Sequence, residues 1–274
     1  MPLSTGWLRY GERDEYLAYT AVVERASAPQ PAVIVLQEAG GVDPHIEDVT
    51  RRFAAAGYFA IAPDLFARDG QRPPDLTRER LAELIDLYNA LPPGALADPA
   101  VRAAELGRRS PDQAARLEET VARIFTGGAT QPDQYLPHVR ATAAWLRTAN
   151  PATAGQKIGV IGFCMGGGLA GLYATDDPDL GAAAIFYGMS PASALAARIR
   201  CPVRGFYGAS DRRINDSVPA FAEAMKQAGG SFEAHVYDGA GHAFFNDART
   251  SYHPGAARDA FARVLELFRT ALAS

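Results

Sequence analysis

The chain of 274 residues contains only two cysteines, Cys164 and Cys201, and no Cys-x-x-Cys pair. Two cysteines cannot form the disulfide framework of a small secreted protein, and no cluster of Cys and His predicts a zinc site. The sequence therefore implies no metal and no organic cofactor.

Long apolar runs and basic tracts are also missing. No apolar segment approaches the about 20 residues that span a bilayer, and residues 1–11 lack the basic start and apolar stretch of a signal peptide. Lys and Arg are dispersed and the net charge is −4, so the chain lacks the basic patch that is typical of a nucleic-acid-binding protein. We expect a cytoplasmic protein that acts on a small molecule, without nucleic-acid or membrane partners, as a monomer or homodimer.

What the chain does contain is a regular alternation of short apolar runs and amphipathic stretches. The runs predict strands at residues 7–10, 16–23, 32–37, 59–62, 157–161, 182–187, 203–207 and 232–237. Helices are predicted at about 45–56, 138–148, 166–174, 216–228 and 256–272. This order predicts an α/β fold: a mostly parallel central sheet with helices on both faces, entered by an antiparallel pair.

Residues 68–134 interrupt this pattern. The segment is charged, has Pro and Gly at its edges, and contains helical stretches around 77–90 and 111–125. We interpret it as a helical insertion within one domain spanning residues 1–274. It could close over the site as a lid, or it could be a structural insertion without a role there.

The sharpest motif is Gly162-Phe163-Cys164-Met165-Gly166, directly after the apolar run KIGVI. It has the spacing of the G-x-nucleophile-x-G elbow of the α/β-hydrolase fold, with cysteine in place of serine. The turn from strand to helix leaves no room for side chains at the two glycines, and the helix N-terminus favours a thiolate. The alternative, a small buried cysteine without function, fits the strand and helix context less well.

A triad needs a base and an acid after the nucleophile in the chain. His242 follows the last predicted strand, and Asp211 follows the strand at 203–207, in the order nucleophile, acid, histidine. Asp216 is a rival acid, but we expect it to cap a helix. Four other histidines are better explained as surface or structural residues: His45, His138, His235 and His253.

The motifs AVIVLQ with Glu38, AGYFAIAPDLF, GFCMGG, GASD and AGHAF together resemble the dienelactone hydrolase family (carboxymethylenebutenolidase-like) over nearly the whole chain outside 68–134. The resemblance implies an ester or lactone hydrolase with the triad Cys164, Asp211 and His242. It also implies that Glu38 contacts the resting thiol, and that the amides of Ala39 and Met165 form the oxyanion hole.

One feature departs from that family. Its best-known members bind a substrate carboxylate with two arginines, one of them four residues after the histidine, where this chain has Asn246, close to Phe244. Arg78 or Arg80 could supply the other. The departure favours, as an alternative, a general carboxylesterase or thioesterase with the same triad. A more distant alternative is a binding or redox-sensing protein on a hydrolase fold.

Overall fold

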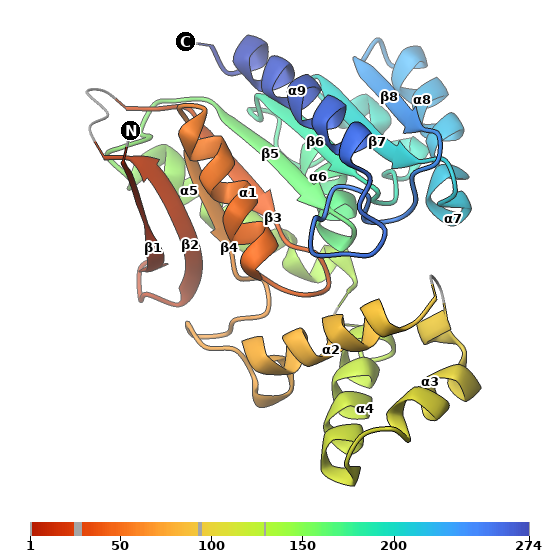
Figure 1. Cartoon of the computed structure of the whole chain (residues 1–274). Coiled ribbons are helices and arrows are strands. Elements are labelled where there is room, and N and C mark those ends of the chain that lie inside the picture. Colours follow the sequence, from red (N-terminus) through yellow and green to blue (C-terminus); the bar gives the residue numbers. More distant parts are fainter. Residues whose placement is uncertain (1, 25–28, 93–94, 129, 274) are drawn as a thin grey trace.

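The centre of the molecule is one eight-stranded sheet, seen in a computed structural model that describes residues 2–24, 29–92, 95–128 and 130–273 (Figure 1). The strand order is β1-β2-β4-β3-β5-β6-β7-β8. The first two strands and the β2–β4 pair are antiparallel, and all other pairs are parallel. The strands are β1 (Leu3–Tyr10), β2 (Tyr16–Val23), β3 (Ala32–Leu36), β4 (Phe59–Pro63), β5 (Ile158–Phe163), β6 (Ala182–Phe186), β7 (Val203–Gly208) and β8 (Phe232–Tyr237).

Helices cover both faces of this sheet. Successive side chains of a strand point to opposite sides, and in the buried strands both sets are apolar, so each face needs a covering layer. In β3, Val33 and Val35 belong to one apolar core, and Ile34 and Leu36 belong to the other. The first core packs against α1 (Pro44–Ala55) and α9 (Pro254–Ala271), which lie together in Figure 1. The second packs against α5 (Leu136–Thr148), α6 (Met165–Ala174) and α8 (Val218–Gln227). The predicted α/β-hydrolase fold class is confirmed.

Between β4 and α5 the chain leaves the sheet. It forms η1 (Pro74–Leu76), α2 (Arg78–Ala90), η2 (Ala95–Ala97), α3 (Pro99–Leu106), α4 (Pro111–Phe125) and η3 (Pro132–Tyr135). Figure 1 shows α2, α3 and α4 grouped beside the main body. An added Cβ at Gly40 would lie 3.2 Å from Ile85 Cδ1, and one at Gly41 would lie 3.0 Å from Leu81 Cδ1. Helix α2 therefore packs directly on the loop that follows β3.

Local sequence signals account for most helix boundaries. Asp43 caps α1 by accepting a hydrogen bond from the Ile46 amide, with Pro44 in the first turn. The predicted stretches 77–90 and 111–125 match α2 and α4 within one residue.

The stretch at 216–228 departs from the prediction. It begins instead with the short helix α7 (Arg212–Asn215), which is followed by α8. The predicted capping role of Asp216 is wrong, since Asp216 ends α7 and Ser217 precedes α8.

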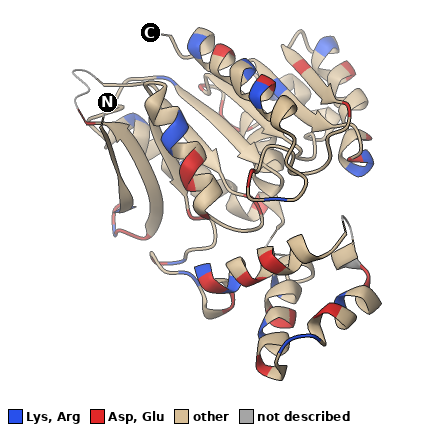
Figure 2. Ribbon diagram, viewed as in Figure 1, with Lys and Arg blue, Asp and Glu red and all other residues tan. Residues whose placement is uncertain are grey.

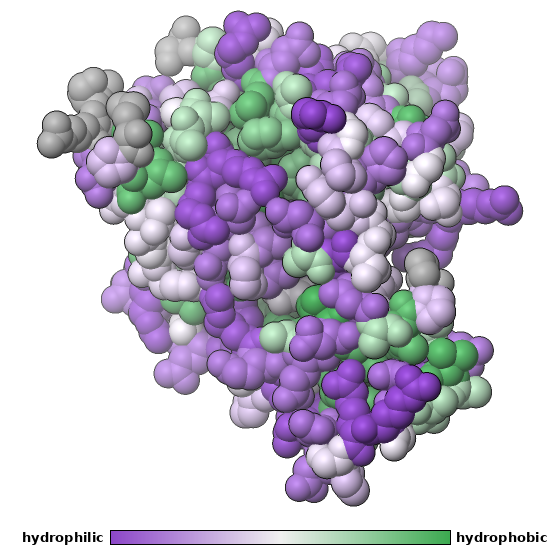
Figure 3. Space-filling model, viewed as in Figure 1, coloured by the Kyte–Doolittle hydropathy of each residue, from purple (hydrophilic) through white to green (hydrophobic). Residues whose placement is uncertain are grey.

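The surface carries mixed charge. Figure 2 shows Lys and Arg interspersed with Asp and Glu rather than gathered on one face. In Figure 3 apolar side chains are concentrated over the α2–α4 region, where Phe125 is half exposed and a cavity of about 550 Å³ lies between α2 and α4. Among the described residues, no helix combines the length and the apolar character needed to cross a membrane.

Candidate active site

Cys164 occupies the sharp turn between β5 and α6. Its backbone has φ 54° and ψ −116°, a left-handed conformation that is strained for a residue with a side chain. A Cβ added at Gly162 would lie 1.9 Å from the Gly166 carbonyl oxygen, and one at Gly166 would lie 2.4 Å from the Leu36 carbonyl oxygen. Only glycine fits at either position, so the elbow brings the start of α6 against the end of β3.

His242 and Asp211 meet beside this turn. Asp211 follows β7 and His242 follows β8, and His242 Nδ1 lies 2.5 Å from Asp211 Oδ2. Burial opposes protonation of the imidazole, but the charge of Cys164 and the hydrogen bonds with Asp211 and Cys164 outweigh it and raise the pKa of His242 well above its usual value. The protonated imidazole donates from Nδ1 to Asp211. The structure thus brings together the three residues that the sequence singles out.

Glu38, just beyond β3, is held by two donors. Its side chain is buried, its Oε1 accepts a hydrogen bond from the Tyr187 hydroxyl at 2.9 Å, and its Oε2 accepts one from Asn246 Nδ2 at 2.9 Å. In the described part of the chain these are the two hydrogen bonds of its carboxylate. The contact with the resting thiol that the family resemblance implies is not among them.

Tyr187 is a site residue that the sequence reasoning missed. It follows β6, has φ 37°, and is fully buried, with its ring centroid 5.1 Å from that of His242. Burial and the neighbouring Glu38 carboxylate raise the pKa of Tyr187 well above its usual value. A tyrosine at the carboxyl end of a central strand, followed by Gly188, was the available signal.

The four predicted substrate contacts divide into two pairs. Asn246 binds Glu38, and Phe244 is buried with its ring centroid 5.5 Å from that of Tyr187. Arg78 donates to Glu47 in α1 and lies over the Trp7 ring. Arg80 donates to three groups at α4, namely Thr120 Oγ1, the Arg116 carbonyl and Glu119. None of these partners of Arg78 and Arg80 is Cys164, Asp211 or His242.

Ala39 and Met165 flank the elbow, one after β3 and the other at the first position of α6. Their amides as oxyanion donors stay a prediction. Within the described ranges, no group of three His, Cys, Asp or Glu side chains is arranged to hold a metal ion.

The remaining histidines have other surroundings. His253 caps α9 by accepting from the Ala256 amide, and His45 lies 3.3 Å from Asp247. Burial lowers the pKa of His138 to about 4. His235 stacks on Phe206.

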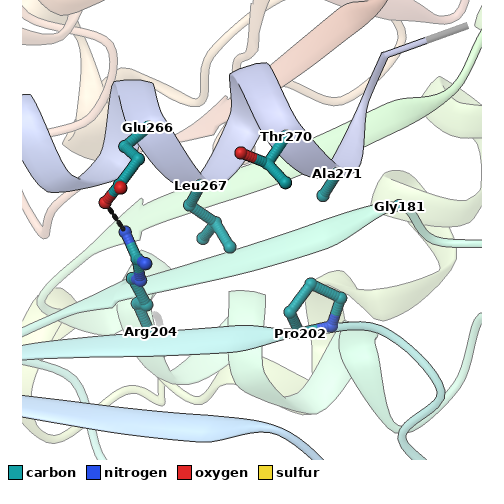
Figure 4. A pocket seen from close by; sticks show the side chains of 7 residues that line it. All are labelled: Gly181, Pro202, Arg204, Glu266, Leu267, Thr270 and Ala271. Carbon is teal, nitrogen blue, oxygen red and sulfur yellow. Dashed lines mark hydrogen bonds and ion pairs between the residues drawn. The ribbon is translucent and has the colours of Figure 1, made fainter.

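A hollow next to α9 does not contain any of these residues. It has about 440 Å³ and lies between α9 and the starts of β6 and β7, lined in part by Gly181, Pro202 and the Arg204–Glu266 ion pair (Figure 4). In a parallel sheet, functional side chains gather at the carboxyl ends of the strands. This hollow lies at the opposite ends.

Three kinds of comparison bear on this geometry. A family model described as "Dienelactone hydrolase family" matches residues 18–272. A provisionally named carboxymethylenebutenolidase of Yersinia pestis is 32% identical over 266 residues, covering 93% of this chain and 84% of the relative. One from Saccharolobus solfataricus is 31% identical over 242 residues, covering 88% of this chain and 90% of the relative. The crystal structure of a provisionally named dienelactone hydrolase from Klebsiella pneumoniae superposes with a TM-score of 0.70 at 30% identity. The match covers 98% of this chain and 99% of that structure's chain.

Proposed function

Because the chain belongs to the dienelactone hydrolase family, we propose that it cleaves a carboxylic ester or lactone through Cys164, His242 and Asp211. The observation that carries this proposal is the His242–Asp211 hydrogen bond beside a cysteine in a strained elbow. An imidazole with a raised pKa stabilises a neighbouring thiolate, and the thiolate is the nucleophilic form of cysteine.

The reaction runs in two halves. The Cys164 thiolate attacks the carbonyl carbon, and the amides of Ala39 and Met165 receive the charge that develops on the carbonyl oxygen. The carbon–oxygen bond then breaks, His242 donates its proton to the leaving alkoxide, and a thioester remains on Cys164. His242 next takes a proton from water, which attacks the thioester and releases the acid and the thiolate.

A carboxylesterase or thioesterase with an uncharged pocket is the second candidate. Asn246 supports it, because this residue stands where the best-known family members have an arginine and is engaged with Glu38. A free nucleophilic thiol requires reducing conditions, so we also propose the cytoplasm as its location. We expect a small-molecule substrate and a monomer or homodimer.

The test compares the wild type with Cys164→Ala on p-nitrophenyl acetate and on a dienelactone. We expect turnover that falls to the uncatalysed rate in Cys164→Ala, while Cys201→Ala, which removes the other thiol, keeps most of it. Electrospray mass spectrometry of the wild type during turnover should show an added acyl group on Cys164.

The result decides between the candidates. Preference for the dienelactone supports the lactone hydrolase, and preference for the neutral ester supports the carboxylesterase. Equal rates in the wild type and Cys164→Ala would contradict the mechanism and leave the binding or redox-sensing protein as the better explanation.

A further inference from the structure

The loop that follows β3 forms a tight turn, here called the 38–43 turn, where the elbow packs against the end of that strand. The Gly41 amide donates to the Glu38 carbonyl at 3.0 Å, and the Asp43 amide donates to the Gly41 carbonyl at 3.0 Å. The amide of Ala39, inside this turn, takes no part in either hydrogen bond. The proposed mechanism uses this amide as an oxyanion donor, so the course of the turn decides where that donor lies.

Two side chains of α2 in the helical insertion reach this turn. Ile85 Cδ1 lies 3.2 Å from the place where a Cβ of Gly40 would stand, and Leu81 Cδ1 lies 3.0 Å from that of Gly41. The two residues are four positions apart, so they share one face of the helix. Gly40 does not have a positive φ, so the close approach of α2, and not the backbone conformation, explains a glycine at this position.

A buried ion pair also touches the turn. Arg72, which precedes α2, donates from Nη2 to the Val42 carbonyl at 3.3 Å, and the same nitrogen lies 3.1 Å from where a Cβ of Gly41 would stand. Its Nε lies 2.6 Å from Oδ2 of Asp64, directly after β4, and both side chains are buried. The guanidinium thus joins the 38–43 turn to the end of a neighbouring strand.

The turn needs such support because of its own sequence. The consecutive glycines Gly40 and Gly41 give its backbone more conformational freedom than other residues would. An oxyanion donor has to lie about 2.7–3.1 Å from the oxygen that becomes charged, and misplacement by about 1 Å can cost on the order of 100-fold in rate. A turn with two glycines therefore holds a donor at that precision only where neighbouring side chains restrict it.

We propose that Ile85 and Leu81 of α2 are positioning residues, which hold the amide of Ala39 where the oxyanion forms. Arg72 supports the same turn through the Val42 carbonyl. The helical insertion then contributes to the rate through its packing on the 38–43 turn, and it does so without supplying a group that reacts. The inference rests on the proposed hydrolase function.

The experiment compares two truncations in α2 with p-nitrophenyl acetate as the substrate. Ile85→Ala should lower kcat about 10- to 100-fold and change KM less than about twofold, because an oxyanion donor acts on the transition state. Leu87→Ala is the matched control. Leu87 is fully buried in the same helix but lies roughly 160° from Ile85 around its axis, so its truncation should keep kcat within about threefold of the wild type.

Further variants separate positioning from stability. Gly40→Ala should lower kcat, because the new Cβ would lie 3.2 Å from Ile85 Cδ1 and 3.3 Å from Asp43 Oδ2. Ile85→Val removes that Cδ1, so Gly40→Ala/Ile85→Val should be faster than Gly40→Ala, a rescue that two independent losses would not give. Alkylation of Cys164 by iodoacetamide forms no oxyanion, so its rate should change less than about twofold in each variant.

Equal losses of kcat in Ile85→Ala and Leu87→Ala would overturn the inference, because the insertion would then act only through the stability of the fold. A higher KM with unchanged kcat in Ile85→Ala would also overturn it, since Ile85 would then affect substrate binding alone.

Hydrogen exchange keeps the test independent of turnover. The hydrogen-bonded amides of Gly41 and Asp43 should exchange at least about tenfold faster in Ile85→Ala than in Leu87→Ala, measured by mass spectrometry of peptides that contain them. Equal exchange in the two variants would contradict the positioning role. If the wild type hydrolyses no ester but the difference in exchange persists, the proposed function fails and the restraint of the turn by α2 stands.

Discussion

The buried carboxylate of Glu38 allows a quantitative test of the candidate site. Asn246→Leu keeps the side-chain shape but removes the Nδ2 donor 2.9 Å from Glu38 Oε2, together with the Oδ1 atom that accepts from the Ala248 amide at 3.0 Å. A hydrogen bond to a charged group contributes about 1.5–3 kcal/mol. Because the Tyr187 hydrogen bond remains, we expect the loss of the Asn246–Glu38 hydrogen bond alone to lower the free energy of unfolding by about 2 kcal/mol. In a chain of this length that corresponds to a melting temperature lower by roughly 4–8 °C.

The assay is urea unfolding followed by circular dichroism, run as a double-mutant cycle with Glu38→Met. Once the carboxylate is gone, Asn246→Leu should cost about 2 kcal/mol less than in the wild type, because only the hydrogen bond from the Ala248 amide to Asn246 Oδ1 is then lost. The effect of Glu38→Met on the Tyr187 hydroxyl is present in both halves of the cycle and cancels. The reasoning is refuted if Asn246→Leu costs the same in both backgrounds, because the amide would then stabilise the fold without acting on Glu38.

Two further predictions concern the triad and its thiol. Asp211→Asn should lower the pKa of His242, since the carboxylate helps to raise it, and should reduce kcat on the order of 10³- to 10⁴-fold. An NMR titration that finds the imidazole pKa unchanged would count against the pairing of Asp211 with His242. Iodoacetamide at pH 8 should alkylate Cys164 and spare Cys201, because burial raises the pKa of the Cys201 thiol to about 12. A modified Cys201 in peptide mass spectrometry would contradict this difference in reactivity.

The sequence predicted those parts of the site that depend on local spacing. The elbow could be recognised because its two glycines lie within two residues of Cys164. The close contact of Gly162 is with Gly166 in the same turn, whereas that of Gly166 is with Leu36 in β3. Asp211 and His242 could be found because each follows a strand in a fixed order along the chain.

Contacts that join distant segments could not be predicted in this way. Tyr187 meets Glu38 across 149 residues, and this contact exists only because β6 and β3 both flank β5 in the sheet. Tyr88 meets Arg249 because the insertion folds back over the loop after β3. Arg78 and Arg80 are arginines in the expected segment, but carboxylates on α1 and α4 bind them.

Strand β6 supplies none of the three residues of the proposed triad, yet it sets the distance between two of them. It lies between β5, which ends at Cys164, and β7, which precedes Asp211, so about two interstrand spacings, roughly 10 Å, separate the strands. A slip of one residue would shift the ends by about 3.3 Å, and misplacement by about 1 Å can cost on the order of 100-fold in rate. Under the proposed mechanism, catalysis therefore constrains the fully buried alanines at 182–184 in addition to packing.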